Sequence, residues 1–428
     1  MERWRGQSEI TIVTPVKPEA MSALGELLGA MAREVLGNDV LPFGRLTNTH
    51  FARFFLLDSA QAHDGIQLPA YLIFMSDIDG RPEEGLAELV DVGGNGIDHL
   101  YCHCIGYPIA LPASRQARLE YLRGHIVRAD VNYVNTIGRT VQQIRGEAEV
   151  REAIEDFLDR GGPELVGGNP SAVRAAIREF VTSDGRLNWA LTPAPAPPLA
   201  YRVRELVHFV VPVILGLLLL PVLVPVLLVW LAVLRLHEIR DPSPLVKPDR
   251  AHLEQLRALE DYTVQNQFIA AGFLKPGWFR RVTAVVILWL VGFGARHLFN
   301  NGNLAGVKTI HFARWILLDG SVRSVFVSNY DGSTESYMDD FIDKVAWALN
   351  AVFSHGAGYP ATRWLLFGGA RDEQAFKGFL RAHQLPTQVW YAAYDQLSAL
   401  NIVDNARIRA GLRGDMTELE AQNWLRLL

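Results

Sequence analysis

The 428-residue sequence predicts an α+β protein built from two copies of one βαββαβ unit that pack together, with an apolar hairpin inserted between them. Three observations support this prediction. Blocks of sequence recur at a nearly constant offset, the apolar periodicities follow the same order in both copies, and a strongly apolar run separates the copies. Internal repeats of this kind indicate duplication of a whole structural unit.

The clearest repeat is HFARFFLLD at residues 50–58, which reappears as HFARWILLD at residues 311–319 with seven of nine positions identical. Two further blocks recur at an offset of 252 residues: FMSDIDG (74–80) with FVSNYDG (326–332), and HCIGYP (103–108) with HGAGYP (355–360). The duplication spans roughly residues 9–159 and 264–414.

Hydrophobic periodicity assigns the elements of the first copy. The predicted strands are residues 10–15, 51–57, 71–76 and 131–135. The predicted helices are residues 21–36, 82–104, 119–124 and 141–159. The core of this order is the ferredoxin-like βαββαβ unit, whose sheet has helices on one face only. Its bare face must be buried, and the nearest partner is the other copy.

The predicted organisation has five parts. They are a first ferredoxin-like repeat (1–160), a Pro/Gly/Ala-rich linker (161–202), a membrane-inserted helical hairpin (203–240), a connecting segment (241–263) and a second ferredoxin-like repeat (264–428). A single membrane crossing would separate two repeats that share a core. The inserted segment must therefore return the chain to the side on which it entered.

The apolar run at residues 207–236 has membrane composition, because no Asp, Glu, Lys or Arg precedes Arg235 in it. About 20 apolar residues span a bilayer, so the run is long for one helix. Pro212, Pro221 and Pro225 interrupt it, which favours two short helices joined near residues 220–225. The alternative is an unusually apolar hairpin between the repeats that meets no membrane.

Arginines flank both ends of this run, at Arg202, Arg204, Arg235 and Arg240. The positive-inside preference then places the folded repeats on the cytoplasmic side of a membrane. A second apolar stretch, residues 282–295, aligns with the first helix of the first copy. We interpret it as a domain helix whose outer face lies on or dips into the membrane surface.

Composition and motifs exclude several classes of protein. Hydrophobic residues at 49% and charged residues at 20% argue against a disordered chain, and a net charge of −5 argues against nucleic-acid binding. No signal peptide is expected at the N-terminus. Phosphate-loop, nucleophile-elbow and zinc motifs are missing from the sequence. Cys102 and Cys104 fit buried small side chains better than metal ligands, so no metal site is predicted.

Four repeated polar residues are candidate catalytic residues: Arg53, Arg314, Asp79 and Asp331. An arginine that points between the sheets could stabilise an oxyanion, and a carboxylate at the mouth of the barrel could transfer a proton. The structural alternative is an arginine paired with a helix carboxylate and an Asp-Gly turn that caps a helix. For His50 and His311, a hydrogen bond to a loop carbonyl is the corresponding alternative.

His103 and His355 begin the repeated His-x-x-Gly-Tyr-Pro motif at the end of a predicted helix. A histidine at a helix C-terminus is favoured by the helix dipole, which is the structural interpretation. The functional interpretation is a haem-iron ligand, since a neutral imidazole on a helix is the usual proximal ligand.

The duplicated pattern resembles the dimeric α+β barrel superfamily at the level of fold, including dye-decolourising peroxidases and chlorite dismutases, which hold a haem through a histidine. The resemblance implies haem as cofactor, with His355, or else His103, as its ligand. Two functions follow: a membrane-associated peroxidase-like oxidoreductase acting on a lipophilic small molecule, or a non-catalytic lipid-binding or scaffold protein. Membrane lipid is the expected partner in both, and nucleic acid is in neither.

Overall fold

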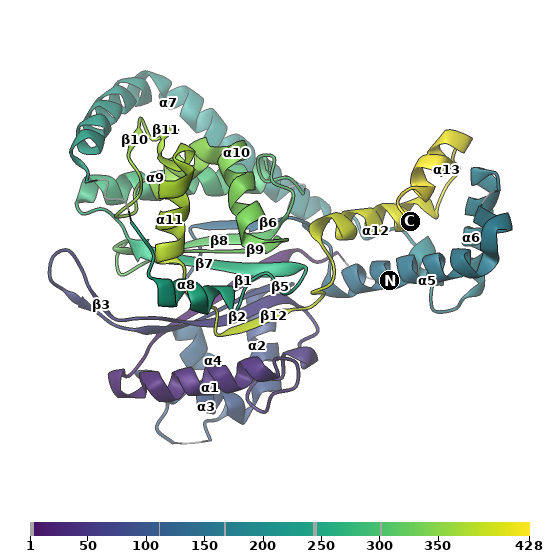
Figure 1. Cartoon of the computed structure of the whole chain (residues 1–428), viewed down its shortest axis with the longest axis horizontal. Helices are drawn as coiled ribbons and strands as arrows, with labels where there is room; N and C mark the ends of the chain where they lie inside the picture. The colour runs from purple at the N-terminus through teal and green to yellow at the C-terminus, as the bar shows by residue number, and fades with distance from the viewer. Residues whose placement is uncertain (1–3, 111, 167, 243–245, 300–301) are drawn as a thin grey trace.

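The computed structural model describes residues 4–110, 112–166, 168–242, 246–299 and 302–428 (Figure 1). The protein is mixed α/β, with two four-stranded antiparallel sheets that face each other across an apolar interface. Helices cover the two outer faces, one long helix arches over the second half, and a helical arm extends from one end.

The first sheet has the order β1 (Gln7–Pro15), β5 (Tyr71–Asp79), β2 (Thr49–Leu57) and β12 (Val389–Ala392). The second has the order β7 (Gln265–Phe273), β9 (Arg323–Asp331), β8 (Ile310–Leu318) and β6 (Val131–Val134). Two small hairpins are β3 (Ala60–Gln61) with β4 (Gln67–Leu68) and β10 (Thr362–Arg363) with β11 (Phe367–Gly368).

The sheets exchange their last strands. β6 of the first copy pairs with β8, and β12 of the second copy pairs with β2. The chain first runs briefly beside β1, where Val127 N donates to Thr11 O at 2.9 Å, and then crosses to the other sheet. The two halves therefore share their sheets and their core, but two self-contained ferredoxin-like repeats are not confirmed.

The outer helices pack on the sheets through apolar faces. On the first sheet lie α1 (Met21–Arg33), α2 (Pro82–Gly93), α3 (Asn95–Tyr101) and α4 (Arg115–Gly124). On the second lie α9 (Trp278–His297), α10 (Thr334–Phe353) and α11 (Glu373–His383). In α1 the buried residues Leu24, Leu28 and Met31 follow the helical period. The helix expected over residues 82–104 breaks at Gly94, whose φ is +50°.

The predicted linker at 161–202 contains structure that the sequence analysis missed. The helix α5 (Val141–Val166) runs beyond residue 160, and α6 (Pro170–Ser183) follows it. With α12 (Ala399–Gly411) and α13 (Glu418–Leu425) these helices form the arm in Figure 1. Ile154, Ile177, Ile408 and Trp424 belong to its separate apolar core. Short 3₁₀ helices are Pro18–Ala20, Phe43–Arg45, Asn188–Leu191 and Gly369–Arg371.

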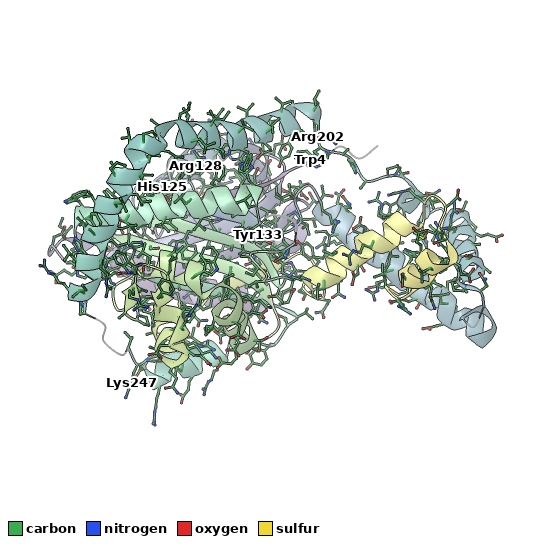
Figure 2. The ribbon with its side chains drawn as sticks, turned by 90° about the horizontal axis from the view of Figure 1, so that it is seen from above. Trp4, His125, Arg128, Tyr133, Arg202 and Lys247 are labelled. Carbon is green, nitrogen blue, oxygen red and sulfur yellow. The ribbon has the colours of Figure 1, made fainter. Side chains whose placement is uncertain are left out.

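The predicted membrane hairpin is wrong in detail, because residues 199–240 form one continuous 42-residue helix, α7 (Leu199–Arg240). A proline removes one helical hydrogen bond and bends the helix. Ending it also requires turn-forming residues, and residues 220–225 contain no Gly, Asn or Asp. Both views show α7 as a bent rod (Figure 1, Figure 2). The described part of the connecting segment contains the helix α8 (Arg250–Arg257).

Candidate functional site

Both ends of α7 are fixed to α9. At the start of α7, Glu205 pairs with Arg296 at 2.6 Å, and the rings of Phe209 and Phe293 lie 5.7 Å apart. Towards the end of α7, Trp230 packs against Phe279 with ring centroids 4.4 Å apart. We call residues 199–208 and 231–240 the two feet of α7 and residues 209–230 its arch.

The arch is longer than the stretch of α9 that it faces. At 1.5 Å per residue, α7 runs about 31 Å from Phe209 to Trp230, whereas α9 runs only about 21 Å from Phe279 to Phe293. Because both pairs of rings are in contact, the arch must bow outward, on the order of 10 Å beyond the line between its ends. Pro212, Pro221 and Pro225 supply the bend.

The bowed segment is apolar and faces solvent. Leu218 is 71% exposed and Val222 62%, and most other large apolar side chains of the arch are at least 40% exposed, whereas Phe209, Val210 and Trp230 are half-buried. The facing helix α9 also exposes Val285, Trp289 and Leu290. By length and composition both helices could cross a membrane. They differ in burial: in an apolar stretch of 18 residues, 6% is buried in α7 and 39% in α9. Exposed apolar surface of this extent marks an interaction site.

The second foot is held by the buried carboxylate of Glu238 and the half-buried carboxylate of Asp241, which follows it. Glu238 accepts hydrogen bonds from the backbone N–H groups of Trp364 and Leu365, both at 2.8 Å, and from Thr362 Oγ1 at 3.0 Å. Asp241 pairs with Lys275 at 2.9 Å and with Arg280. The arch therefore starts and ends on a rigid support.

The first foot borders a polar cleft of about 780 Å³. We call it the arginine cleft; its charged lining residues are Arg5, Arg81, Arg128, Arg204, Arg296, Glu9, Glu84, Asp130 and Glu205. The aromatic side chains of Trp4, Tyr201 and Trp289 also line it. Figure 2 places Trp4 and Arg202 at this foot, with Arg128 between α7 and α9 in that view.

This cleft was not predicted from the sequence, because its residues come from the N-terminus, the start of α2, the crossing segment, β6, α7 and α9. Its charged residues are scattered in sequence and lie outside the repeated blocks. The only signal was the pair of arginines, Arg202 and Arg204, before the apolar run. An imidazole pair lies at the same foot, with His208 Nδ1 2.7 Å from His297 Nε2.

The repeated histidines and aspartates form two equivalent structural contacts. His50 Nε2 lies 3.0 Å from Asp79 Oδ1, and His311 Nε2 lies 2.6 Å from Asp331 Oδ1. The second oxygen of Asp79 accepts the N–H of Val141, which begins α5, at 2.8 Å. In the same way Asp331 accepts the N–H of Ala399, which begins α12, at 2.7 Å. Each aspartate thus fixes the first turn of a helix, and both histidines bond to carboxylates instead of loop carbonyls.

The two repeated arginines cross the interface between the sheets. Arg314, on β8, reaches the first sheet, where it pairs with Asp77 at 2.5 Å and Glu9 at 3.1 Å. Arg53, on β2, reaches the second sheet and donates to the carbonyls of Phe268 and Ser328, both at 3.4 Å. The partners are strand groups and not the helix carboxylates of the structural alternative.

The environments of these two arginines differ in charge. The residues equivalent to Glu9 and Asp77 are Gln267 and Asn329, which pair with each other in the sheet register. Burial lowers the pKa of Arg53 to about 9, an effect that the carboxylate of Asp77 partly offsets. Neither side-chain polar atom of the buried Asn329 has a hydrogen-bond partner among the described residues.

The His-x-x-Gly-Tyr-Pro motif pairs with a Lys-Pro dipeptide that also occurs in both copies, at residues 17–18 and 275–276. Lys17 N donates to His103 O at 3.0 Å, and Lys275 N donates to His355 O at 2.8 Å. Tyr359 also donates to Asn350 Oδ1 at 2.8 Å, as Tyr107 does to Asp98. Local structure therefore accounts for both motifs.

His103 and His355 do not fit a haem site in the described part of the chain. His355 is fully buried and lines neither of two small apolar cavities in the second half, which measure about 40 and 70 Å³. Those volumes are far smaller than a macrocycle. His103 is half-buried in a turn after α3. Within the described residues no group of three or more His, Cys, Asp or Glu could hold a metal ion.

The cysteines follow the expectation of buried side chains only in part. Cys104 is buried and lies 3.3 Å from Thr14 Oγ1, and burial raises the pKa of its thiol to about 11. Cys102 is half-buried. A thiol with a raised pKa is a poor nucleophile at neutral pH.

Replacement of His355 by leucine should weaken the acid sensitivity of the fold. Burial, together with the charges of Arg280 and Lys275, lowers the pKa of His355 to about 3. An unfolded histidine titrates near 6.5, so this residue favours the folded state above pH 6.5 and loses that contribution as the pH falls toward 3. The slope is up to about 1.4 kcal/mol per pH unit.

Unfolding midpoints at pH 7 and pH 4.5 measure this effect in His355→Leu and wild-type protein. The variant should be about as stable as wild type at pH 7, because no ordinary hydrogen bond to either ring nitrogen is lost. If the unfolding midpoint shifts by the same amount between pH 7 and pH 4.5 in both proteins, His355 does not contribute to the acid sensitivity of the fold.

Comparisons with known proteins give no relative: no family model, no curated protein and no solved structure matches the chain. The fold and the arch together define a mixed α/β protein with an exposed apolar helix.

Proposed function

We propose that this chain is a membrane-associated lipid-binding protein that inserts the arch of α7 and the outer face of α9 into one leaflet. The observation that supports the proposal is the continuous apolar surface of an arch that is fixed at both feet. A helix that is apolar all round is stable in lipid and costly to hydrate.

Insertion from one side agrees with the strand exchange. β6 precedes α7 in the chain, yet it lies in one sheet with strands that follow α7. Arg323 also joins the halves directly, pairing with Asp319 and donating to Asp58 O at 3.0 Å. Both flanks of α7 therefore lie on the same side of any membrane. An arch that bows by on the order of 10 Å fits within one leaflet, about 15 Å deep.

Vesicle flotation with the full chain tests the proposal. Protein purified in detergent is mixed with neutral phosphatidylcholine vesicles, the detergent is removed and the sample is floated through a density gradient. We expect the protein to float with the vesicles. Protease added outside the vesicles should still digest its loops, because only the arch and the outer face of α9 enter the lipid. Protein that stays soluble and monodisperse without lipid or detergent would contradict membrane seating.

Sidedness is a separate part of the proposal. Arg202, Arg204, Arg235 and Arg240 lie on the feet of α7, and positive charge beside a membrane segment favours the cytoplasmic side. We therefore propose that the folded halves are cytoplasmic.

The haem-dependent oxidoreductase remains a prediction without structural support. An absorbance spectrum of detergent-extracted protein separates the two functions. The lipid-binding function predicts colourless protein, whereas a Soret band that His355→Ala abolishes would favour the oxidoreductase.

A further inference from the structure

We infer that the arginine cleft binds the phosphate of an anionic phospholipid whose acyl chains lie along the arch. This inference rests on the proposed membrane seating and adds the chemical class of the ligand. It depends on three features of the cleft beside the first foot: weakly paired arginines, aromatic walls and direct continuity with the apolar surface.

The carboxylates of the cleft are already occupied. Glu205 pairs with Arg296, Glu84 with Arg81 and Glu9 with Arg314. Asp130 accepts the N–H of Leu317 at 2.8 Å. Burial raises the pKa of Glu9 and of Asp130 above the usual range of a carboxyl group.

Three arginines in the cleft lack a strong partner. Arg128 is exposed and makes no hydrogen bond or ion pair with any residue that the structure describes. Arg5 has one long hydrogen bond to Asn48 at 3.5 Å, and Arg204 has one to Glu205 at 3.5 Å. Arginine presents several donors in a planar fork that matches the oxygens of a phosphate group.

The walls suit the interface between lipid and water. Trp4 and Tyr201 contact each other with ring centroids 4.4 Å apart, and Arg204 lies over the Tyr201 ring at 5.3 Å. Trp289 belongs both to the cleft and to the exposed apolar face of α9. Tryptophan and tyrosine prefer the level of the headgroups. A lipid could therefore extend from the cleft onto the apolar surface without a break.

The duplication offers an internal comparison. Arg128 lies on the segment that crosses from the first sheet to the second. On the second crossing Leu385 N donates to Ile269 O as Val127 N does to Thr11 O, so position 127 corresponds to 385 and the equivalent of Arg128 is Pro386. The positive charge is thus present only on the crossing that borders α7 and α9. A requirement of the shared fold would have placed it on both crossings.

Flotation on two vesicle compositions tests the inference: phosphatidylcholine alone, and phosphatidylcholine with 20 mol% phosphatidylglycerol. Each arginine near an anionic surface should contribute about a fivefold increase in partitioning. Wild type should therefore bind the anionic vesicles far more strongly. The triple variant Arg5→Gln/Arg128→Gln/Arg204→Gln should lose most of that increase while still binding neutral vesicles.

The matched control is Arg33→Gln/Arg45→Gln/Arg123→Gln, which removes equal charge from exposed positions in α1, the 3₁₀ helix Phe43–Arg45 and α4. In Figure 1, α1 and α4 lie on the side of the sheets opposite α7. This control should bind both vesicle types as wild type does. An equal loss of binding to anionic vesicles in both triple variants would show that net charge, and not the arginine cleft, causes the preference. If wild type binds anionic vesicles no better than neutral ones, the lipid-phosphate site in the cleft is contradicted but the proposed membrane seating is not. Failure on both vesicle types would instead contradict the proposed membrane seating.

Competition distinguishes a lipid headgroup from free phosphate. Inorganic phosphate at 10 mM, with ionic strength matched by chloride, should leave the binding of wild type to anionic vesicles unchanged, because a lipid is also held through its chains. Displacement by phosphate would show that the cleft is a site for the free anion and would overturn the lipid assignment.

Discussion

Replacement of Asp77 by asparagine is expected to lower the free energy of unfolding by about 2–4 kcal/mol. The carboxylate of Asp77 lies 2.5 Å from Arg314, whose side chain is 3% exposed between the sheets. Removing one partner of a buried ion pair leaves a charge that water cannot reach. Glu9, at 3.1 Å, remains and limits the loss. Chemical denaturation of both proteins in the same detergent measures the difference.

The reciprocal variant Asn329→Asp provides the matched control. It places a carboxylate at the equivalent position of the second half, where Arg53 donates to the carbonyl oxygens of Phe268 and Ser328. It should raise the free energy of unfolding, by about 1 kcal/mol. A loss below 0.5 kcal/mol for Asp77→Asn, or destabilisation by Asn329→Asp of about the same size, would show that the charge difference between the two arginine sites is immaterial.

Two aspartates in the arch, Leu218→Asp/Val222→Asp, are expected to remove the protein from neutral vesicles. Both side chains are more than 60% exposed and lie on one face of α7, four residues apart. A carboxylate within the hydrocarbon region costs about 2.5–3.5 kcal/mol at the bilayer centre and less near the surface. The two together should reduce partitioning by at least 50-fold, measured by flotation.

The control for this variant is Ile66→Asp/Leu419→Asp, which changes two equally exposed apolar side chains outside the arch. It should float as wild type does. Both variants should keep the wild-type thermal midpoint, because none of the four side chains is buried in a core. Flotation of the arch variant at the wild-type level would mean that α7 does not enter the lipid.

The sequence predicted most elements of the first half within a few residues, because duplicated blocks and apolar periodicity specify local structure. β1, β2 and β5 appear where expected and extend slightly further. The predicted strand at 131–135 is also present, but periodicity cannot tell which sheet it joins. That choice depends on contacts such as Asp130 N with Trp315 O, which link residues 185 positions apart.

The candidate site was less accessible to sequence reasoning. Duplication draws attention to His50, Asp79 and their equivalents, and these residues stabilise the fold by bonding each other and a helix terminus. The arginine cleft lies where the two halves differ, so no repeated motif marks it. The apolar composition of the arch was evident from the sequence. That it forms one helix held at both feet depends on tertiary contacts, such as Glu238 with Trp364 and Glu205 with Arg296, which the sequence does not show.

The exchanged strands have a consequence for biosynthesis. The first sheet lacks its edge strand until residues 389–392 have been made, although its other three strands are complete by residue 79. A ribosome therefore exposes α7 well before the N-terminal half can close, so the nascent chain meets a bilayer or a chaperone in an unfinished state. By the same logic, a nick between the halves would yield two fragments that fold only together, each supplying the missing edge of the other.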